Sequence, residues 1–131
     1  MPGLLTKLLG DRGERAAAKF LKQAGYRIIA RQYRNQFGEI DLIASDGDCI
    51  VFVEVKTRTS TTSGHPTEAI TPSKQEQLTK LALVFLKRHR LLHRRSRFDV
   101  IAVIWPTGSK VPEIQHYPNA FEATGRGQLF G

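Results

Sequence analysis

Three acidic residues and one lysine stand inside apolar runs of this 131-residue chain. Glu39 and Asp41 stand in the run GEIDLIAS, and Glu54 and Lys56 stand in the run CIVFVEVKTR. Removing an unpaired charge from water costs several kcal/mol, so charges in such runs need a partner or a function. Two carboxylates on one face of a sheet could share a Mg²⁺ ion, and a nearby lysine could hold a phosphate or an attacking water. These residue types therefore indicate phosphodiester chemistry.

An Asp-Gly pair at 46–47 separates the two runs and predicts a two-residue hairpin turn. This turn places Leu42 opposite Val51, and it makes Asp41 and Glu54 diagonal neighbours with Cβ atoms about 7 Å apart. Residues that face each other point to the same side of a sheet, so the hairpin has one apolar side and one charged side. The apolar side, which we expect in the core, holds Ile40, Leu42, Ala44, Cys49, Val51, Val53 and Val55. The other side holds Glu39, Asp41, Ile43, Ile50, Phe52, Glu54, Lys56 and Arg58.

The charged side of this hairpin also has a simpler interpretation. Antiparallel sheets often expose one face to water, and Asp41 or Glu54 could then be paired with Lys56 or Arg58 on a solvated surface. The spacing alone leaves both interpretations open.

Periodicity and end signals predict one mixed β-sheet with helices packed on it, in the order helix, three strands, helix, strand. The expected helices are a short turn over 3–9, a helix over 12–25 that follows an Asp11 cap, and a helix from a Thr71 cap to about His89. The expected strands are 26–34, the two hairpin arms, 98–105, and a short edge strand over 113–117. We expect 59–70 to be a loop, 1–124 to form a single domain, and 125–131 to be a flexible tail.

Charge and cysteine content point to the chain's partners and compartment. Lys and Arg number 20 against 12 Asp and Glu, and this net charge of +8 favours a polyanionic partner, although it could also serve solubility alone. The single cysteine, Cys49, excludes an internal disulfide and suits a reducing compartment. The N-terminal MPGLLTKLLG is too short and too polar to span a membrane. We therefore expect a soluble cytoplasmic protein without membrane contact.

The string GEIDLIASDGDCIVFVEVKTR at 38–58 resembles the signature of the YraN-like family of small bacterial proteins. That family belongs to the PD-(D/E)XK nuclease superfamily, which includes the archaeal Holliday-junction resolvases. The resemblance implies a restriction-endonuclease-like core and a site built from Asp41 and Glu54 as metal ligands, Lys56 as the lysine of the E-x-K element, and Glu14 as a further metal or water ligand. Ile40 replaces the proline of the superfamily name. Resolvases act as symmetric dimers, so the resemblance also leaves a homodimer open.

Several site candidates keep two interpretations at this point. Glu14 follows Asp11 at the spacing of a helix capping box, which would give it a purely structural role. Glu39 could stand at the mouth of the site or simply be exposed. Lys74 and Gln75 lie in the first turn of the second long helix, where they could bind phosphate or only be solvated.

A dense group of basic residues closes that helix and is the expected nucleic-acid surface, although it would also complement the helix dipole. Without aromatic residues interleaved among them, we expect contacts to the backbone and shape of the nucleic acid rather than base stacking. The predicted contact residues are Lys87, Arg88, Arg90, Arg94, Arg95 and Arg97, extended by Arg31, Arg34 and Arg58.

Two further features lie near this surface in the sequence. His89 and His93 have a spacing that can bind zinc, but no third ligand is near in the sequence. Asp99 is expected to pair with a nearby arginine.

Taken together, the sequence favours a divalent-metal-dependent DNA endonuclease using Mg²⁺ or Mn²⁺, with selectivity for branched DNA as a finer expectation. The alternative is a non-catalytic nucleic-acid-binding module that keeps the nuclease fold. A protein-interaction domain that docks on acidic partners is a third interpretation. The C-terminal GQLFG only partly matches the peptides that bind bacterial sliding clamps, so a sliding clamp is the least supported partner.

Overall fold

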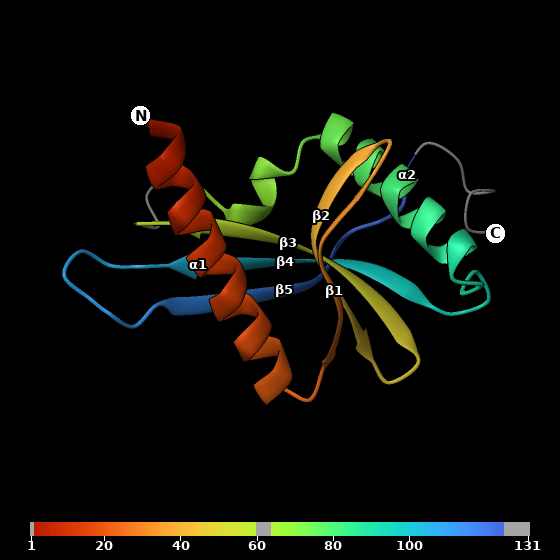
Figure 1. The fold of residues 1–131 in the computed structure, drawn as a ribbon, viewed down its shortest axis with the longest axis horizontal. Coiled ribbons are helices and arrows are strands. Elements are labelled where there is room, and N and C mark those ends of the chain that lie inside the picture. Colours follow the sequence, from red (N-terminus) through yellow and green to blue (C-terminus); the bar gives the residue numbers. More distant parts are fainter. Residues whose placement is uncertain (1, 60–63, 125–131) are drawn as a thin grey trace.

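The structure, a computed structural model, describes residues 2–59 and 64–124 (Figure 1). It contains two long helices, one short 3-10 helix and five strands, and their order matches the predicted helix, three strands, helix and strand, with one further strand at the end. The elements are α1 (Pro2–Gln23), β1 (Arg27–Asn35), β2 (Gly38–Asp46), β3 (Cys49–Arg58), η1 (Pro66–Ala69), α2 (Pro72–Arg88), β4 (Ser96–Ile104) and β5 (Glu113–Phe121).

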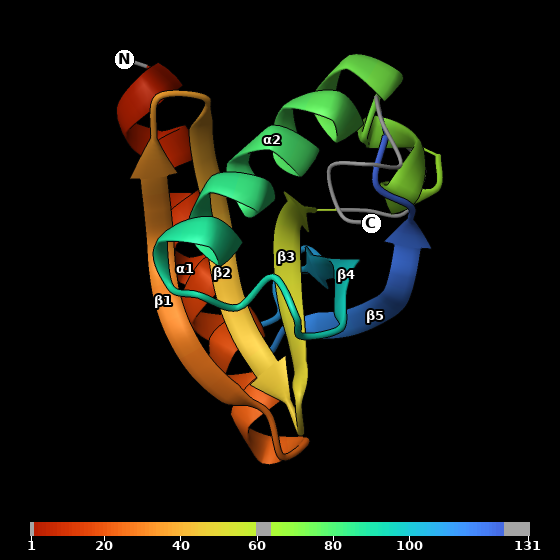
Figure 2. The same cartoon turned by 90° about the vertical axis from the view of Figure 1, so that its right-hand side faces the viewer.

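The five strands form one mixed sheet in the order β1-β2-β3-β4-β5. Neighbouring strands are antiparallel except β3 and β4, which are parallel and are joined through η1 and α2. In Figure 2, α2 crosses in front of the sheet and α1 lies behind β1 and β2. The architecture is therefore α/β, with a helix packed on each face of a single sheet.

Each face of the sheet carries its own apolar core. On the α1 side, Ala17, Ala18 and Leu21 pack against Leu42, Cys49, Val51, Val53, Ile101 and Val103. On the α2 side, Leu78, Leu81, Ala82, Phe85 and Leu86 pack against Ile40, Ile43, Ile50, Phe52, Phe98 and Val100. Strands buried on both faces read as nearly continuous apolar runs, which is the pattern that β3 and β4 have in the sequence.

The first helix is longer than predicted. It runs without a break from Pro2 to Gln23, so Asp11 lies inside it and does not cap it. Asp11 instead approaches Lys7 one turn earlier and accepts a hydrogen bond from Gln32 on β1. The capping box predicted for Asp11 and Glu14 is therefore wrong, because no helix begins there. The predicted end is confirmed: Gly25 has a φ of 96°, a left-handed conformation that closes the helix.

The hairpin of β2 and β3 forms as predicted, but its register differs by two residues. Asp46 pairs with Cys49 and Leu42 pairs with Val53, so the turn residues are Gly47 and Asp48. A shift of two residues keeps every side chain on its predicted side, since strand side chains alternate with a period of two. The predicted assignment of hairpin residues to an apolar side and a charged side therefore still holds, although the predicted register is wrong.

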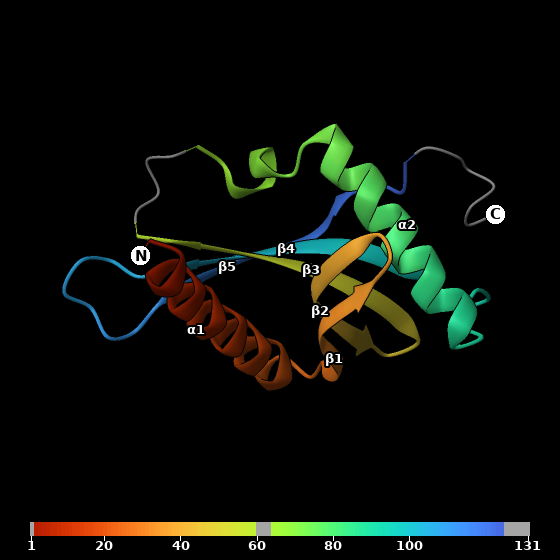
Figure 3. The ribbon, with the colours of Figure 1, turned by 45° about the horizontal axis from the view of Figure 1, so that its top comes forward.

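Ile40 is the exception to this alternation. The pairing of β2 with β3 stops at Leu42 and Val53, whereas β2 stays paired with β1 as far as Gly38. Figure 3 shows the β1–β2 hairpin leaving the plane of the other strands and curling toward α2. Ile40 is buried, as expected, but in the α2-side core and not beside Leu42.

The tip of the β1–β2 hairpin is fastened to α2 by side-chain hydrogen bonds. Gln77 donates to the carbonyl of Phe37 at 2.6 Å, and Asn35 donates to the carbonyl of Leu81 at 3.4 Å. These bonds hold the end of β2 over the α2 side of the sheet. They therefore fix the position of Glu39 and Asp41, which lie between the tip and the point where β2 leaves β3.

The second half of the chain follows the predicted pattern with small differences. Thr71 caps α2 by accepting from the N–H of Lys74 at 3.2 Å, as expected. The segment predicted as a loop contains η1, and the last strand extends to Phe121. Within the described ranges, no helix is long and apolar enough to cross a membrane. The predicted tail at 125–131 lies outside the described residues.

Candidate active site

The candidate site forms where β2 and β3 separate. Just beyond the last pair, Leu42 with Val53, the carboxylate of Asp41 accepts a hydrogen bond from the backbone N–H of Val55 at 2.8 Å. The side chain thus replaces a backbone acceptor that the diverging strand no longer supplies. We call this opening between the strands the notch, defined by Asp41 on β2 and Glu54 on β3.

Glu54 is buried, with 6% of its surface exposed. Burial raises its pKa to about 7, and the nearby charge of Asp41 acts in the same direction. Burial also raises the pKa of Asp41, although the Val55 N–H and the charge of Lys56 oppose the shift. The influence of Asp41 on the pKa of Glu54 places the two carboxyls within electrostatic reach of each other.

A third carboxylate reaches the notch from the other face of the sheet. Carboxylate oxygens of Glu14 on α1 and of Glu39 and Asp41 on β2 all lie within 4.8 Å of one another. Burial raises the pKa of Glu14 to about 7, and the charge of Asp41 acts in the same direction. The helix approaches β3 closely here because Gly13 has no side chain: an added Cβ would lie 3.2 Å from the Cβ of Thr57.

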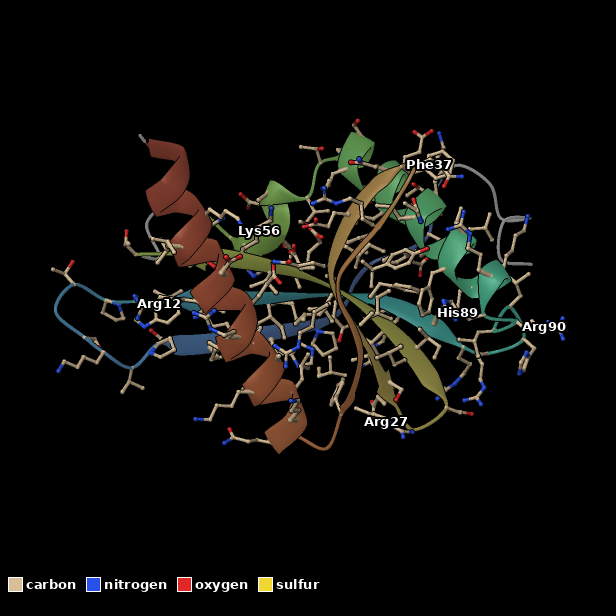
Figure 4. The ribbon with its side chains drawn as sticks, viewed as in Figure 1. Arg12, Arg27, Phe37, Lys56, His89 and Arg90 are labelled. Carbon is tan, nitrogen blue, oxygen red and sulfur yellow. The ribbon has the colours of Figure 1, made fainter. Side chains whose placement is uncertain are left out.

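Two lysines supply the positive charge at the notch. Lys56 lies two residues beyond Glu54 on β3, and Lys74 lies in the first turn of α2. Their charges oppose the upward pKa shifts of both Asp41 and Glu54, which places both ammonium groups within electrostatic reach of these carboxylates. In Figure 4, Lys56 lies beside α1 and near η1. Lys74, one of the two candidates on α2, is therefore at the site.

The donor set of the notch fits a hard divalent cation. It consists of carboxylate oxygens from two elements, α1 and β2, and carboxylates are the ligands that Mg²⁺ and Mn²⁺ prefer. The raised pKa values of Glu14 and Glu54 mark acids that are costly to ionise without a counter-charge. The residues that would hold such an ion are Glu14, Glu39 and Asp41, with Glu54 next to Asp41.

Glu39 is the member of this group that the sequence prediction left undecided. It sits two residues before Asp41 on the same strand, so the period of two was a usable signal for it. Its partner Arg34, on β1, donates to it through Nε at 3.2 Å. Arg34 is thus placed at the rim of the site, bridged to an acid.

Gln75, in contrast, does not face the notch as an orienting group. Its amide donates to the carbonyl of Ile70 at 3.0 Å and so ties α2 to the residue that follows η1. In the first turn of α2, Lys74 therefore lies near the carboxylates of the notch, whereas Gln75 bonds to the segment that connects η1 with α2.

The predicted basic surface lies at the opposite end of the sheet from the notch. In Figure 4, Arg90 and His89 lie at the right end of the molecule and Lys56 lies on the left. The exposed members, which we call the basic end, are Lys87, Arg88, Arg90, Arg94 and Arg95. Arg31 and Arg58 do not extend it: Arg31 is exposed midway along β1, and Arg58 at the far end of β3 donates to the carbonyl of Gly64 at 2.8 Å.

Arg97 belongs to a structural network rather than to an open phosphate-binding surface. Its Nε donates to the fully buried Asp99 at 2.9 Å, and its Nη2 donates to the hydroxyl of Tyr26 at 2.7 Å. Burial alone would raise the pKa of Asp99, but hydrogen bonds from His116, Arg97 and the backbone of Asn119 lower it below its usual range. The expected pairing of Asp99 with an arginine is confirmed, and Arg97 is occupied by it.

Among the described residues, no further metal-ligating side chain completes a site with the histidine pair at the end of α2. His89 and His93 are both exposed, and the ring of His89 packs against that of Phe85 at an angle of 35°, with centroids 4.4 Å apart. Across the described ranges, the one group with metal-ligand geometry is the carboxylate cluster at the notch. The zinc interpretation therefore has no support in the described residues.

The fold and the site define an α/β protein with a single mixed sheet and with carboxylates gathered where two of its strands separate. The model of the uncharacterised protein family UPF0102 matches residues 13–103, and the chain belongs to this family, also known as the YraN family. UPF0102 proteins from Trichlorobacter lovleyi and Geobacter metallireducens are 49% and 47% identical to it. These alignments cover 87% and 91% of this chain, and 90% and 96% of the relatives.

Among solved structures, that of Pyrococcus furiosus SfsA in complex with Ca²⁺ is similar at 16% identity with a TM-score of 0.38. The alignment covers 86% of this chain and 63% of the SfsA chain.

Proposed function

We propose that this protein binds nucleic acid and hydrolyses DNA phosphodiester bonds with Mg²⁺ or Mn²⁺. The observation that carries the proposal is the convergence at the notch of Glu14, Glu39 and Asp41, with Glu54, Lys56 and Lys74 within electrostatic reach of Asp41. A purely structural salt-bridge cluster would not be expected to hold glutamates whose pKa values are raised to about 7. An excess of acid over base in a partly closed site favours a bound cation.

A divalent ion at the notch would supply Lewis-acid stabilisation of the charge that develops on the phosphate oxygens. The side chains at the notch would bind the phosphates, position the attacking water and accept its proton. Lys56 would hold a non-bridging phosphate oxygen or position the attacking water, and Lys74 would bind an adjacent phosphate together with the N-terminal end of α2. Glu54, with a pKa of about 7, can accept a proton from water near neutral pH.

The basic end is the proposed second contact with DNA. Its exposed side chains neutralise backbone phosphates without reading sequence, so we expect affinity to fall steeply with salt. Since it lies at the opposite end of the sheet, a substrate that contacts both regions must extend beyond the cleaved bond. Branched DNA is the finer part of the proposal, and a homodimer would place two notches on its two strands.

A cleavage assay tests the proposal. The wild-type protein is incubated with linear duplex, single-stranded, flap and four-way-junction DNA in Mg²⁺, in Mn²⁺ or in chelator. We expect metal-dependent cleavage that Asp41→Asn and Lys56→Ala reduce by at least about 100-fold, in line with the loss of one charge-stabilising group. The matched controls, Asp48→Asn and Lys80→Ala, remove the same charges from exposed positions and should cleave as the wild type does.

Binding of all these DNAs without any cleavage, equal in the wild type and in Asp41→Asn, would contradict the proposal. That result would instead identify a non-catalytic binding module. Cleavage that persists in chelator would contradict the metal dependence.

A further inference from the structure

A pocket of about 260 Å³ lies on the α2 side of the sheet, under η1. It is smaller than the roughly 300–1,000 Å³ of sites for drug-sized ligands, so it suits a single flat ring system. Its lining combines two aromatic rings, a guanidinium and an amide with two apolar residues. The lining residues are Arg58, Gly64, His65, Pro66, Ile104, Gln115 and Tyr117.

The strand registers place this pocket next to the notch. Lys56 pairs with Ala102 on β4, and Ala102 pairs with Gln115 on β5, so the three residues form one row across the sheet. Neighbouring strands are about 4.8 Å apart, which puts the Cα atoms of Lys56 and Gln115 about 10 Å apart. Ala102, the residue between them, is fully buried, so the row gives the separation of Lys56 from the pocket and not an open path between them. A nucleotide strand held at Lys56 could place a neighbouring nucleotide at this separation.

Contacts within the chain orient the walls of the pocket. The rings of His65 and Tyr117 meet edge to face, with centroids 4.6 Å apart. Nδ1 of His65 accepts from the N–H of Thr67, and the Tyr117 hydroxyl donates to Oε1 of Gln115 at 2.6 Å. The last bond uses the carbonyl oxygen of the amide, so the amide nitrogen can donate to a ligand.

We propose that this pocket binds an unpaired nucleobase next to the phosphate held at the notch. The inference rests on the proposed function, because the notch is what would place the strand there. Unpaired bases stack on aromatic rings and on arginine planes and hydrogen-bond through their edges, and the pocket offers a partner for each of these contacts. A base inside an intact duplex cannot enter it. The preferred DNA therefore has an unpaired nucleotide beside the cleaved bond.

Sequence patterns could not indicate this pocket. His65 and Tyr117 lie far apart in the chain, on η1's cap and on β5, and neither is interleaved with basic residues. The fold brings their rings together with Arg58. Base stacking, which the sequence argued against, is therefore proposed from the structure.

Binding without cleavage tests the pocket. The affinity of the full-length protein for a fluorescently labelled single-stranded DNA of mixed sequence is measured by anisotropy in chelator. Tyr117→Leu should weaken binding roughly 5- to 100-fold, the usual effect of removing a stacking ring, whereas Tyr117→Phe should keep it within about two-fold. His65→Ala, at an exposed position, should weaken binding without disturbing the core. Thermal melting of each variant checks its fold.

A strand of the same length whose nucleotides are abasic separates base contacts from backbone contacts. It should bind the wild type more weakly than normal DNA does, and Tyr117→Leu should not weaken it further. Equal affinity of wild type, Tyr117→Leu and His65→Ala for normal single-stranded DNA would overturn the proposal. Because no metal or cleavage is needed, a failure of the nuclease proposal would be seen in the cleavage assay and not here.

Discussion

The pKa values of Glu54 and Glu14 lie near neutral pH, and the stability of the protein should therefore depend on pH in this range. In the unfolded chain a glutamate loses its proton near the ordinary pKa of 4.5, but in the folded protein both keep it up to a pKa of about 7. Between these values the folded state binds more protons than the unfolded state. The free energy of unfolding of the metal-free protein therefore falls as pH rises through this window.

The first prediction concerns Glu54→Gln, which keeps the shape of the side chain and removes its charge. At pH 8 this variant should be more stable than the wild type by about 1–3 kcal/mol, and at pH 4 the two should be alike. Urea unfolding of metal-free protein at both pH values measures the difference. The control, Glu76→Gln on the exposed face of α2, should change stability little at either pH. A wild type that becomes more stable from pH 5 to pH 8 would contradict the assigned pKa direction.

The second prediction separates the two arginines that flank Ser96. Arg97 holds the fully buried Asp99, so Arg97→Gln should lower the free energy of unfolding by about 3 kcal/mol. Arg95 pairs with the exposed Asp48 at 3.3 Å, and Arg95→Gln should cost less than about 1 kcal/mol. Equal losses of stability in urea unfolding would show that Arg97 is an ordinary surface residue.

At the scale of elements, α1 positions Glu14 through a close approach to β3. A Cβ on Gly13 would collide with the side chain of Thr57, while one on Gly10, a turn earlier, would meet nothing within 4 Å. Gly10 and Gly13 therefore have different roles in α1. Gly13 allows contact, and Gly10 only weakens the helix.

The third prediction follows from this difference. Gly13→Ala should destabilise the protein by about 1–3 kcal/mol, since the helix or Thr57 must shift, and it should also displace Glu14 from the notch. Gly10→Ala should stabilise the protein by up to about 1 kcal/mol through helix propensity alone. Thermal unfolding measures both. Stabilisation by Gly13→Ala equal to that by Gly10→Ala would contradict the close packing of α1 on β3.

Local sequence patterns predicted most helices and strands, because the residues of each element include its capping or turn signals and its hydrophobic period. The cap of α2 at Thr71, the end of α1 at Gly25 and the two faces of the β2–β3 hairpin are of this kind. The start of α1 was wrong because Asp11 is a good cap in isolation, yet the residues before it continue the helix. The hairpin register was wrong by two because alternation cannot distinguish shifts of two residues.

The candidate site was only partly predictable for a related reason. Asp41, Glu54 and Lys56 were placed together by strand spacing alone. The separation of β2 from β3 depends on long-range contacts, such as that of Gln77 with Phe37, which local periodicity does not contain. That separation is what brings in Glu39 and moves Ile40 to the α2 side.

At the scale of the whole molecule, the acidic notch and the basic end occupy opposite ends of the central strands. The start of β4 pairs with Ile50 and Ala102 pairs with Lys56, six residues along β3, which corresponds to about 20 Å. This is the length of about six base pairs of duplex. DNA that contacts both regions must extend at least that far from the cleaved bond.

The fourth prediction tests the basic end. The double variant Arg90→Gln with Arg94→Gln should weaken binding of a long DNA duplex and reduce the slope of log affinity against log salt by about 2. Lys110→Gln, at an exposed position on the β4–β5 loop, is the control and should leave both unchanged, because the loop follows the opposite end of β4. A salt slope that matches the wild type in the double variant would exclude this region from the DNA contact.

The most direct test of a metal centre at the notch is a calorimetric titration of the metal-free protein with Mn²⁺, because everything proposed for the notch requires a cation there. The wild type should bind Mn²⁺ saturably and release protons on binding at pH 6.5–7, since Glu14 and Glu54 must ionise. Asp41→Asn should weaken binding by at least about ten-fold, and Asp48→Asn should bind as the wild type does. Mn²⁺ binding that is equally tight in Asp41→Asn, or absent from the wild type at millimolar Mn²⁺, would contradict a metal centre at the notch.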